Sequence, residues 1–160
     1  MSRTISYRGT IAMGQEERIS LATIQGKIGY KVNKFQIIGT APGTSTFEYV
    51  GKITKVADPN IGPTINFTDA DLLAVAYYED TSGSGGSGNV NTIVFDNEKF
   101  NQDIFVNITD ASGNTTPCNY YIELETMDLS ELETTMLTLR SLRTVTSLSL
   151  IHISEPTRPY

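Results

Sequence analysis

Two pairs of carboxylates come nearest, by type and spacing, to catalytic chemistry in this chain. Asp69 and Asp71 stand two residues apart in one loop-like stretch, and Asp96 and Glu98 do so in another. A glycosidase needs only two acids a set distance apart, one to protonate the leaving group and one to act as base or nucleophile. Acids with this spacing beside turn residues are more typical of solvated caps and loop ends. We therefore expect neither pair to be catalytic.

Other catalytic and metal-binding chemistry is poorly represented in the sequence. The only histidine is His152, and the only cysteine is Cys118. Hydrolases of the serine or cysteine type need a base beside the nucleophile, and zinc sites commonly use several His or Cys ligands. Asp58 and Asn60 add oxygen ligands, but no stretch has the spacing of a calcium-binding EF-hand. We predict a protein that is not an enzyme, has no cofactor and no metal site, and buries Cys118 as a small apolar side chain.

The charge pattern argues against nucleic acid as a partner. The net charge is -6 at pH 7, with 12 Lys and Arg residues scattered among 18 Asp and Glu residues. Phosphate binding relies on clustered cations. The nearest approach to a cluster is Lys27, Lys31 and Lys34, which lies in a strand-like stretch where lysines discourage aggregation at a sheet edge. We expect no nucleic-acid partner.

Hydropathy argues against a membrane protein. No apolar run approaches the roughly 18 residues that would suggest a membrane span. The N-terminal stretch MSRTISYRGTIAMGQEERIS is interrupted by charged residues, among them Arg3, Arg8 and Arg18, and so lacks the apolar core of a signal peptide. We expect a protein made in the cytoplasm and not secreted by a signal peptide.

The elements that must position these residues are short strands. Apolar and polar residues alternate in stretch after stretch, separated by turn sequences such as TAPGTS and DASGNTTP. This pattern is typical of antiparallel sheets that pack face to face. Residues 1–127 are therefore predicted to form one all-β domain, an antiparallel, jelly-roll-like β-sandwich of about eight strands.

Two irregularities are predicted within these strands. Gly9 interrupts the alternation in residues 3–13 and is expected to mark a bulge or bend. In residues 28–37 the alternation slips by one position, which would turn side chains to the opposite face of the sheet unless a bulge absorbs the slip. We place that bulge near Asn33 and Lys34.

One helix is predicted, over residues 128–143. Ser130 and Glu133 have the spacing of a capping box, and apolar residues recur at steps of three and four. The stripe consists of Leu129, Leu132, Met136, Leu139 and Leu142. The pattern leaves two interpretations open: the stripe packs on the sandwich, or it pairs with neighbouring copies of the chain.

The residues after the helix, 144–160, form a tail of unusual character. Residues 148–158 spell LSLIHISEPTR, which is identical to the translation, in one frame, of a widely used transposase-based sequencing adapter. We therefore expect residues 148–160 to be an artefact that carries no information about function. His152 falls within this segment, so residues 1–147 contain no histidine.

Three stretches of the chain resemble a known group of proteins. They are NKFQIIGTAPGTSTFEYVGKITKVADPN, INFTDADLLAVAYYED and NYYIELETMDLSELETTMLTLRSLR. They resemble small proteins encoded by uncultured marine tailed phages, and the similarity extends over most of residues 1–147. It lies in the succession of strands and closing helix, without an invariant chemical motif. The resemblance implies a virion structural protein, such as a decoration, cement or fibre-like component, and it transfers no site residues.

The first functional hypothesis is a phage virion protein that self-associates or docks on a capsid or tail lattice. Its expected partners are further copies of the chain and other virion proteins, and its expected location is the virion. Tyr and Met are common at protein interfaces. The predicted interface residues are Leu132, Met136, Leu139, Tyr78 and Tyr121.

The alternative hypothesis is a carbohydrate-binding module. A receptor-binding phage tip would combine the two hypotheses. Its aromatic platforms would come from Tyr77, Tyr78, Tyr120 and Tyr121. Adjacent residues of a strand point to opposite faces, so at most one tyrosine of each pair is expected to be exposed. The absence of tryptophan weakens this hypothesis.

Overall fold

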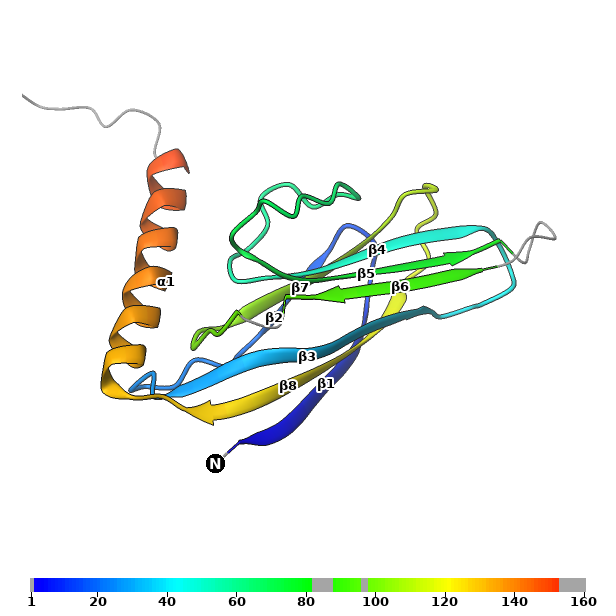
Figure 1. The fold of residues 1–160 in the computed structure, drawn as a ribbon. Helices are drawn as coiled ribbons and strands as arrows, with labels where there is room; N and C mark the ends of the chain where they lie inside the picture. The colour runs from blue at the N-terminus through cyan, green and yellow to red at the C-terminus, as the bar shows by residue number, and fades with distance from the viewer. Residues whose placement is uncertain (1, 82–87, 96–97, 153–160) are drawn as a thin grey trace, which may run out of the picture.

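The computed structural model describes residues 2–81, 88–95 and 98–152, with side chains described as far as Leu142. The described residues form eight strands and one helix. The elements are β1 (Arg3–Ile11), β2 (Glu16–Ile19), β3 (Ile28–Gly39), β4 (Phe47–Thr54), β5 (Leu72–Asp80), β6 (Asn89–Val94), β7 (Ile104–Asp110), β8 (Cys118–Asp128) and α1 (Glu131–His152). Figure 1 shows the strands in two layers, with α1 standing across one end of them. The all-β sandwich predicted from the alternating pattern is confirmed.

The strand pairing follows a jelly-roll pattern with one departure. One sheet has the order β1-β8-β3 and the other β2-β7-β4-β5-β6, and the strand pairs within them are antiparallel. The nested pairs β1 with β8, β2 with β7, and β4 with β5 are those of a chain folded back on itself as a double Greek key. In that scheme β6 would pair with β3, but here it pairs with β5. The sandwich is therefore three strands against five.

The core lies between the two sheets. On β8 the side chains of Cys118, Tyr120, Ile122 and Leu124 alternate into it, and all four are buried. On β4 the side chains of Phe47, Tyr49 and Ile53 point into the core and are also buried. A side chain at Gly51 would come within 3.0 Å of the ring of Phe35, so the glycine lets that ring lie against β4.

A loop covers part of the outer face of the five-stranded sheet. Lys52 and Thr54 point away from the core, yet both are buried. Lys52 Nζ lies 3.3 Å from Asp58 Oδ2 and 3.3 Å from the carbonyl oxygen of Thr64, both in the segment between β4 and β5. The ammonium group is thus paired where it is removed from water, as a buried charge requires.

The two predicted irregularities have different outcomes. The bulge near Asn33 and Lys34 is confirmed, because the pairing of β3 with β8 shifts between Val32 and Lys34. The prediction of a bulge at Gly9 is wrong, because β1 pairs with β8 residue for residue along its length. Gly9 lies opposite Tyr120, and a Cβ at Gly9 would come within 2.9 Å of the tyrosine ring. The glycine makes room for that ring.

The helix starts later and extends further than the predicted 128–143. Asp128 still belongs to β8. Ser130 caps the helix as predicted, since Glu133 N donates to Ser130 Oγ at 3.2 Å. The carboxylate of Glu133 accepts from the Ser130 hydroxyl at 3.3 Å, and not from the backbone N–H of a full capping box. Residues 144–152 contain neither glycine nor proline, so no stop signal ends the helix at residue 143. Residues 153–160 of the predicted tail lie outside the described residues.

We predict that Gly9→Ala lowers the free energy of unfolding by about 1–3 kcal/mol, the usual cost of overpacking a core. The added methyl group would meet the ring of Tyr120, which is held by a 2.8 Å hydrogen bond from its hydroxyl to Glu17. The measurement is urea denaturation of both proteins. Gly62→Ala is the control, because a Cβ there meets nothing closer than 3.9 Å. Equal midpoints for Gly9→Ala and the control would show that the ring does not need the space.

Candidate functional site: the outer face of α1 and the cavity beneath it

The apolar stripe predicted on the helix faces solvent. Leu132 is 69% exposed, Met136 52%, Leu139 55% and Leu142 57%. Of the predicted stripe, Leu129 alone is buried, and it precedes α1. The interpretation in which the stripe packs on the sandwich is therefore wrong for Leu132, Met136, Leu139 and Leu142. We call these four residues the outer face of α1.

The face of α1 that meets the sandwich is mostly polar. It consists of Glu133, Thr134, Leu137, Thr138 and Ser141, which are all partly buried. An amphipathic helix on a protein surface normally turns its apolar stripe toward the core. In α1 the arrangement is reversed.

Asn101 attaches this polar face to the sandwich. Its side chain is 2% exposed, and Nδ2 donates to Thr138 Oγ1 at 3.1 Å and to the carbonyl oxygen of Gly26 at 3.0 Å. Gly26 has φ +64°, a left-handed conformation that favours glycine. One amide group thus links the helix, the segment before β7 and the turn before β3.

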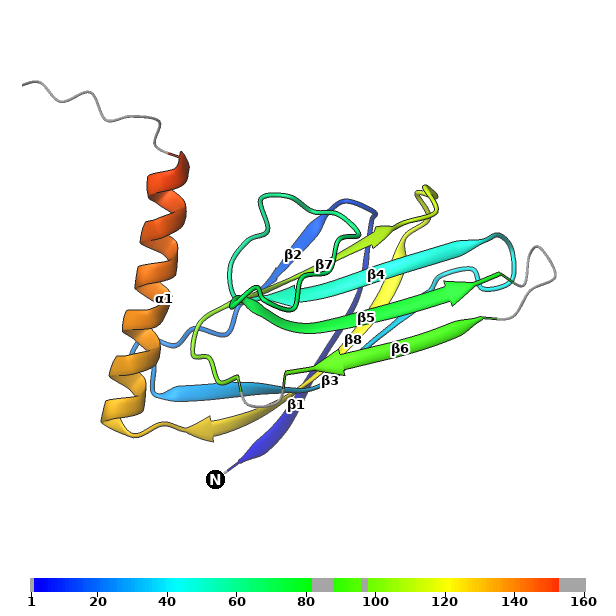
Figure 2. The same ribbon diagram turned by 45° about the horizontal axis from the view of Figure 1, so that its top comes forward.

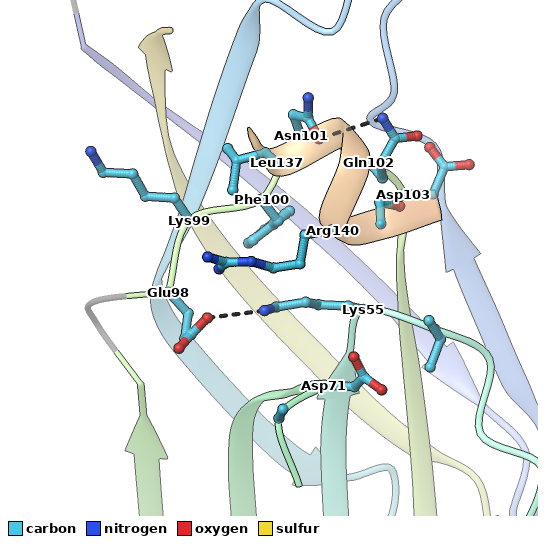
Figure 3. Close-up of a pocket in the computed structure, with 13 residues that line it drawn as sticks. Lys55, Asp71, Glu98, Lys99, Phe100, Asn101, Gln102, Asp103, Leu137 and Arg140 are labelled. Carbon is cyan, nitrogen blue, oxygen red and sulfur yellow. Dashed lines mark hydrogen bonds and ion pairs between the residues drawn. The ribbon is translucent and has the colours of Figure 1, made fainter. Parts of the chain in front are cut away.

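A cavity of about 240 Å³ lies beside this attachment, between α1 and the strand ends. Its walls come from α1, the start of the β4–β5 loop, the last residues of that loop, and residues 98–103. Figure 3 shows the charged residues around it. They are Lys55, Asp71, Glu98, Lys99, Asp103 and Arg140.

The charges around the cavity compensate one another. Lys55 Nζ lies 2.9 Å from Glu98 Oε2, and Lys99 Nζ lies 3.4 Å from Glu133 Oε2 on α1. The side chain of Arg140 extends from α1 over the Lys55–Glu98 pair (Figure 3). Paired charges of both signs at a helix junction favour a role in holding α1 in place.

The carboxylates considered as catalysts occupy turn positions. Asp69 Oδ1 accepts a hydrogen bond of 2.9 Å from the backbone N–H of Asp71, immediately before β5. Burial raises the pKa of Asp71, repulsion from Asp69 raises it further, and Lys55 lowers it. Glu98 is paired with Lys55, and Asp96 lies outside the described residues. The geometry of Asp69 and Asp71 is that of a capped turn.

Asp103 is a partly buried polar group that the sequence did not single out. Burial acts to raise its pKa, but hydrogen bonds from the backbone N–H groups of Ala22 (2.8 Å) and Leu21 (2.7 Å), together with Arg18, lower the pKa below its ordinary value. Arg18 Nε donates to Asp103 Oδ2 at 2.6 Å. These bonds attach the segment after β2 to the start of β7. Since the partners lie more than 80 positions away, no local sequence signal marks the pair.

The predicted interface tyrosines lie apart from the outer face of α1. Tyr78 is near the end of β5, partly buried, and its ring stacks on that of Tyr49 with centroids 6.1 Å apart. Tyr121 is near the start of β8, whereas α1 follows the end of that strand. Tyr121 is also partly buried and its hydroxyl donates to Glu123 at 3.2 Å. Its neighbour Tyr120 lies in the core, as the alternation of a strand requires.

Within residues 2–81, 88–95 and 98–152, no three side chains of the His, Cys, Asp or Glu type gather as metal ligands would. Among the helices described, none is long and apolar enough to cross a membrane.

Compared with known proteins, the chain matches no family model, no curated protein and no solved structure.

We predict that Asn101→Ala lowers the free energy of unfolding by about 1–3 kcal/mol, because it leaves buried partners without hydrogen bonds. The carbonyl of Gly26 and the hydroxyl of Thr138 each lose the bond that Asn101 supplies. Urea denaturation and amide hydrogen exchange measure the effect, and the amides of α1 should exchange faster. Gln102→Ala is the control, since the side-chain hydrogen bond described for Gln102 is a long one, 3.4 Å from its Nε2 to Asn101 Oδ1. Unchanged exchange in α1 would contradict the anchoring role.

A second prediction concerns Cys118, which is fully buried on β8. Burial raises the pKa of its thiol from 9.0 to about 12. Between these values the folded protein holds a proton that the unfolded chain releases, so the free energy of unfolding falls as the pH rises above 9. Because only the thiolate reacts, a disulfide reagent at pH 8 should modify Cys118 slowly in buffer and rapidly in urea. Equal rates in the two solutions would contradict the burial.

Proposed function

We propose that this protein is a non-enzymatic structural component of a phage virion that assembles with further copies of itself through the outer face of α1. The observation that carries the proposal is the reversed orientation of the helix. Its polar face is used against the sandwich, and its apolar face is left to a partner. Contiguous exposed apolar surface of this kind is typical of an interaction site.

The energetics favour a partner on this surface. Leu132, Met136, Leu139 and Leu142 are each more than half exposed in the single chain. Full burial of a Leu or Met side chain is worth about 1.5–3 kcal/mol. Four such residues supply several kcal/mol toward the cost of association, which consists of lost translational, rotational and side-chain freedom. A helix-to-helix contact between copies is the simplest arrangement that buries all four.

The assignment to a virion is supported by two further features. Jelly-roll sandwiches are common in viral capsid domains, although a fold alone does not define a function. The resemblance to small marine phage proteins points to the same class. Under this proposal the partners are other copies and neighbouring proteins of a capsid or tail lattice, and the chain resides in the virion.

The carbohydrate-binding alternative gains no support from the tyrosines on which it was based. Tyr120 is buried, and Tyr77, Tyr78 and Tyr121 are partly buried. A sugar-stacking platform needs an accessible ring face, and none of the four side chains is fully exposed. Glycan binding stays a prediction.

We predict that the triple variant Leu132→Gln, Met136→Gln, Leu139→Gln loses the association of the wild-type chain through α1. Glutamine keeps a good helix propensity while removing the apolar surface. Sedimentation velocity over a range of concentrations should show oligomers for the wild type and a lower mass for the variant. Ile38→Gln is the control, since Ile38 is an exposed apolar residue on β3, 56% accessible. A wild-type chain that stays monomeric at millimolar concentration would overturn the proposal.

The virion role has a separate test. Labelled wild-type protein should co-sediment with particles of the phage that encodes it, and the triple variant should bind at least tenfold more weakly. If neither protein binds the particles while the wild type still forms oligomers, the self-association stands and the virion assignment falls.

A further inference from the structure

The four edge strands of the sandwich differ in charge. The edges of the two sheets are β1 and β3 on one, and β2 and β6 on the other. β1 carries Arg3 and Arg8, β2 carries two glutamates and an arginine, and β3 carries Lys31 and Lys34. β6 reads NVNTIV and has no charged residue. Charged side chains on an edge strand discourage further strand pairing, and β6 lacks this protection.

We infer that β6 is a second assembly surface, where the strand pairs antiparallel with β6 of another copy across a two-fold axis. This inference concerns a surface separate from the outer face of α1. It adds a neighbour at the opposite side of the five-stranded sheet from β2, as Figure 2 shows. The pairing would continue one five-stranded sheet into the five-stranded sheet of the second copy.

The exposure of β6 supports this inference. Residues 89–93 are all exposed although the strand is paired with β5, and Val90 is 59% accessible. Ile93 is exposed as well, on the opposite face of the strand. Exposed β-branched residues on both faces of an unprotected edge are typical of a strand that gains a neighbour.

The chemistry of the edge selects a second copy as the occupant. A two-fold axis brings each strand against itself, so a self-paired strand opposes its own charges. For β1 or β3 such pairing draws arginines or lysines of the two copies together, which is destabilising for like charges directly opposite each other. For β6 it opposes only Asn, Thr, Val and Ile. An uncharged strand of this composition pairs with an identical strand without placing like charges opposite each other.

The edge of β3 is also partly occupied within the chain. Tyr30 N donates to the carbonyl oxygen of Phe100 at 2.8 Å, and Phe100 N donates back to Tyr30 O at 3.0 Å. For β6, the strand pairing that the structure describes is with β5. Edge pairing at β3 is therefore obstructed by a neighbouring segment and by lysines. Among the described residues, β3 lies near β6 but does not pair with it, so the hydrogen-bonding edge of β6 opposite β5 is left unpaired.

The geometry of the pair follows from the alternation of the strand. Opposite residues of an antiparallel pair share one face, and a two-fold axis perpendicular to the sheet passes between a residue and its own copy. An axis at Thr92 places the two Thr92 side chains together and sets Val90 opposite Val94. Thr–Thr and β-branched pairs each stabilise a sheet. An axis at Asn91 is the neighbouring register that keeps the faces aligned.

The test uses the full chain with the Leu132, Met136, Leu139 triple substitution, so that association through α1 is removed. Sedimentation equilibrium up to millimolar concentration should show a weak dimer. Adding Thr92→Lys places two ammonium groups face to face, and the dissociation constant should rise at least tenfold. Thr4→Lys on β1, another exposed threonine of an edge strand, is the matched control and should leave the dimer unchanged.

Disulfide trapping provides the second measurement. With Thr92→Cys in the same background, oxidation should give a covalent dimer, since opposite residues in an antiparallel pair bring Cα atoms to about 4.5–5.5 Å, a distance that a disulfide can span. Cys118 is buried and does not compete. A link through Asn91→Cys in place of Thr92→Cys also supports the pair and fixes the other register. If the triple variant is monomeric and forms no disulfide link from either position, the β6 pair is overturned. The helix interface is tested separately, by comparing the mass of the wild-type chain with that of the triple variant.

Discussion

Three strands lie against five in this sandwich, and that imbalance governs what the molecule leaves exposed. Each sheet must bury one face, and β8 supplies the centre of the smaller sheet with side chains such as Ile122 and Leu124. Because β6 joins β5 and not β3, the larger sheet ends in an edge strand whose residues 89–93 are exposed, while Val94 packs against the core. The loop over Lys52 and the helix across the strand ends protect other parts of the structure. Among the described residues, neither the loop nor the helix pairs with β6.

Polar contacts, and not the apolar stripe, attach α1 to the sandwich in the observed orientation. Asn101 and Thr138 fix which face of the helix meets the sandwich, and the Lys99–Glu133 pair adds to the same side. A buried amide that loses its partners costs about 1–3 kcal/mol, and rotating the helix would break these bonds of Asn101. The leucines thus remain outside, where a partner can cover them. Under the proposed self-association, the contacts that hold α1 on the sandwich are also those that leave its apolar face to a partner.

Local patterns were sufficient to predict much of the fold. Alternation located the strands, the slip in β3 located its bulge, and Ser130 with Glu133 located the helix start. Features that depend on distant residues were not predictable. The alternation predicts a bulge or bend at Gly9, but the glycine is needed to make room for the ring of Tyr120, more than a hundred positions away. The apolar stripe of α1 has the same spacing whether it faces outward or inward. The contact of Thr138, on the other face of the helix, with Asn101 decides between the two orientations. Strand order, and with it the open edge at β6, has no local signal at all.

The position of β8 has a consequence for synthesis of the chain. Neither β1 nor β3 has a strand partner in its sheet other than β8, which is the last of the eight strands to be made. The pairs β1–β8 and β3–β8 join residues far apart in sequence, and such contacts form slowly because a long loop must close first. During translation the apolar residues of the early strands therefore stay exposed until β8 is made. Transiently exposed apolar surface of this kind is what chaperones bind. A ribosome that stalls before residue 118 would release a chain that has all the strands of one sheet and only the two outer strands of the other.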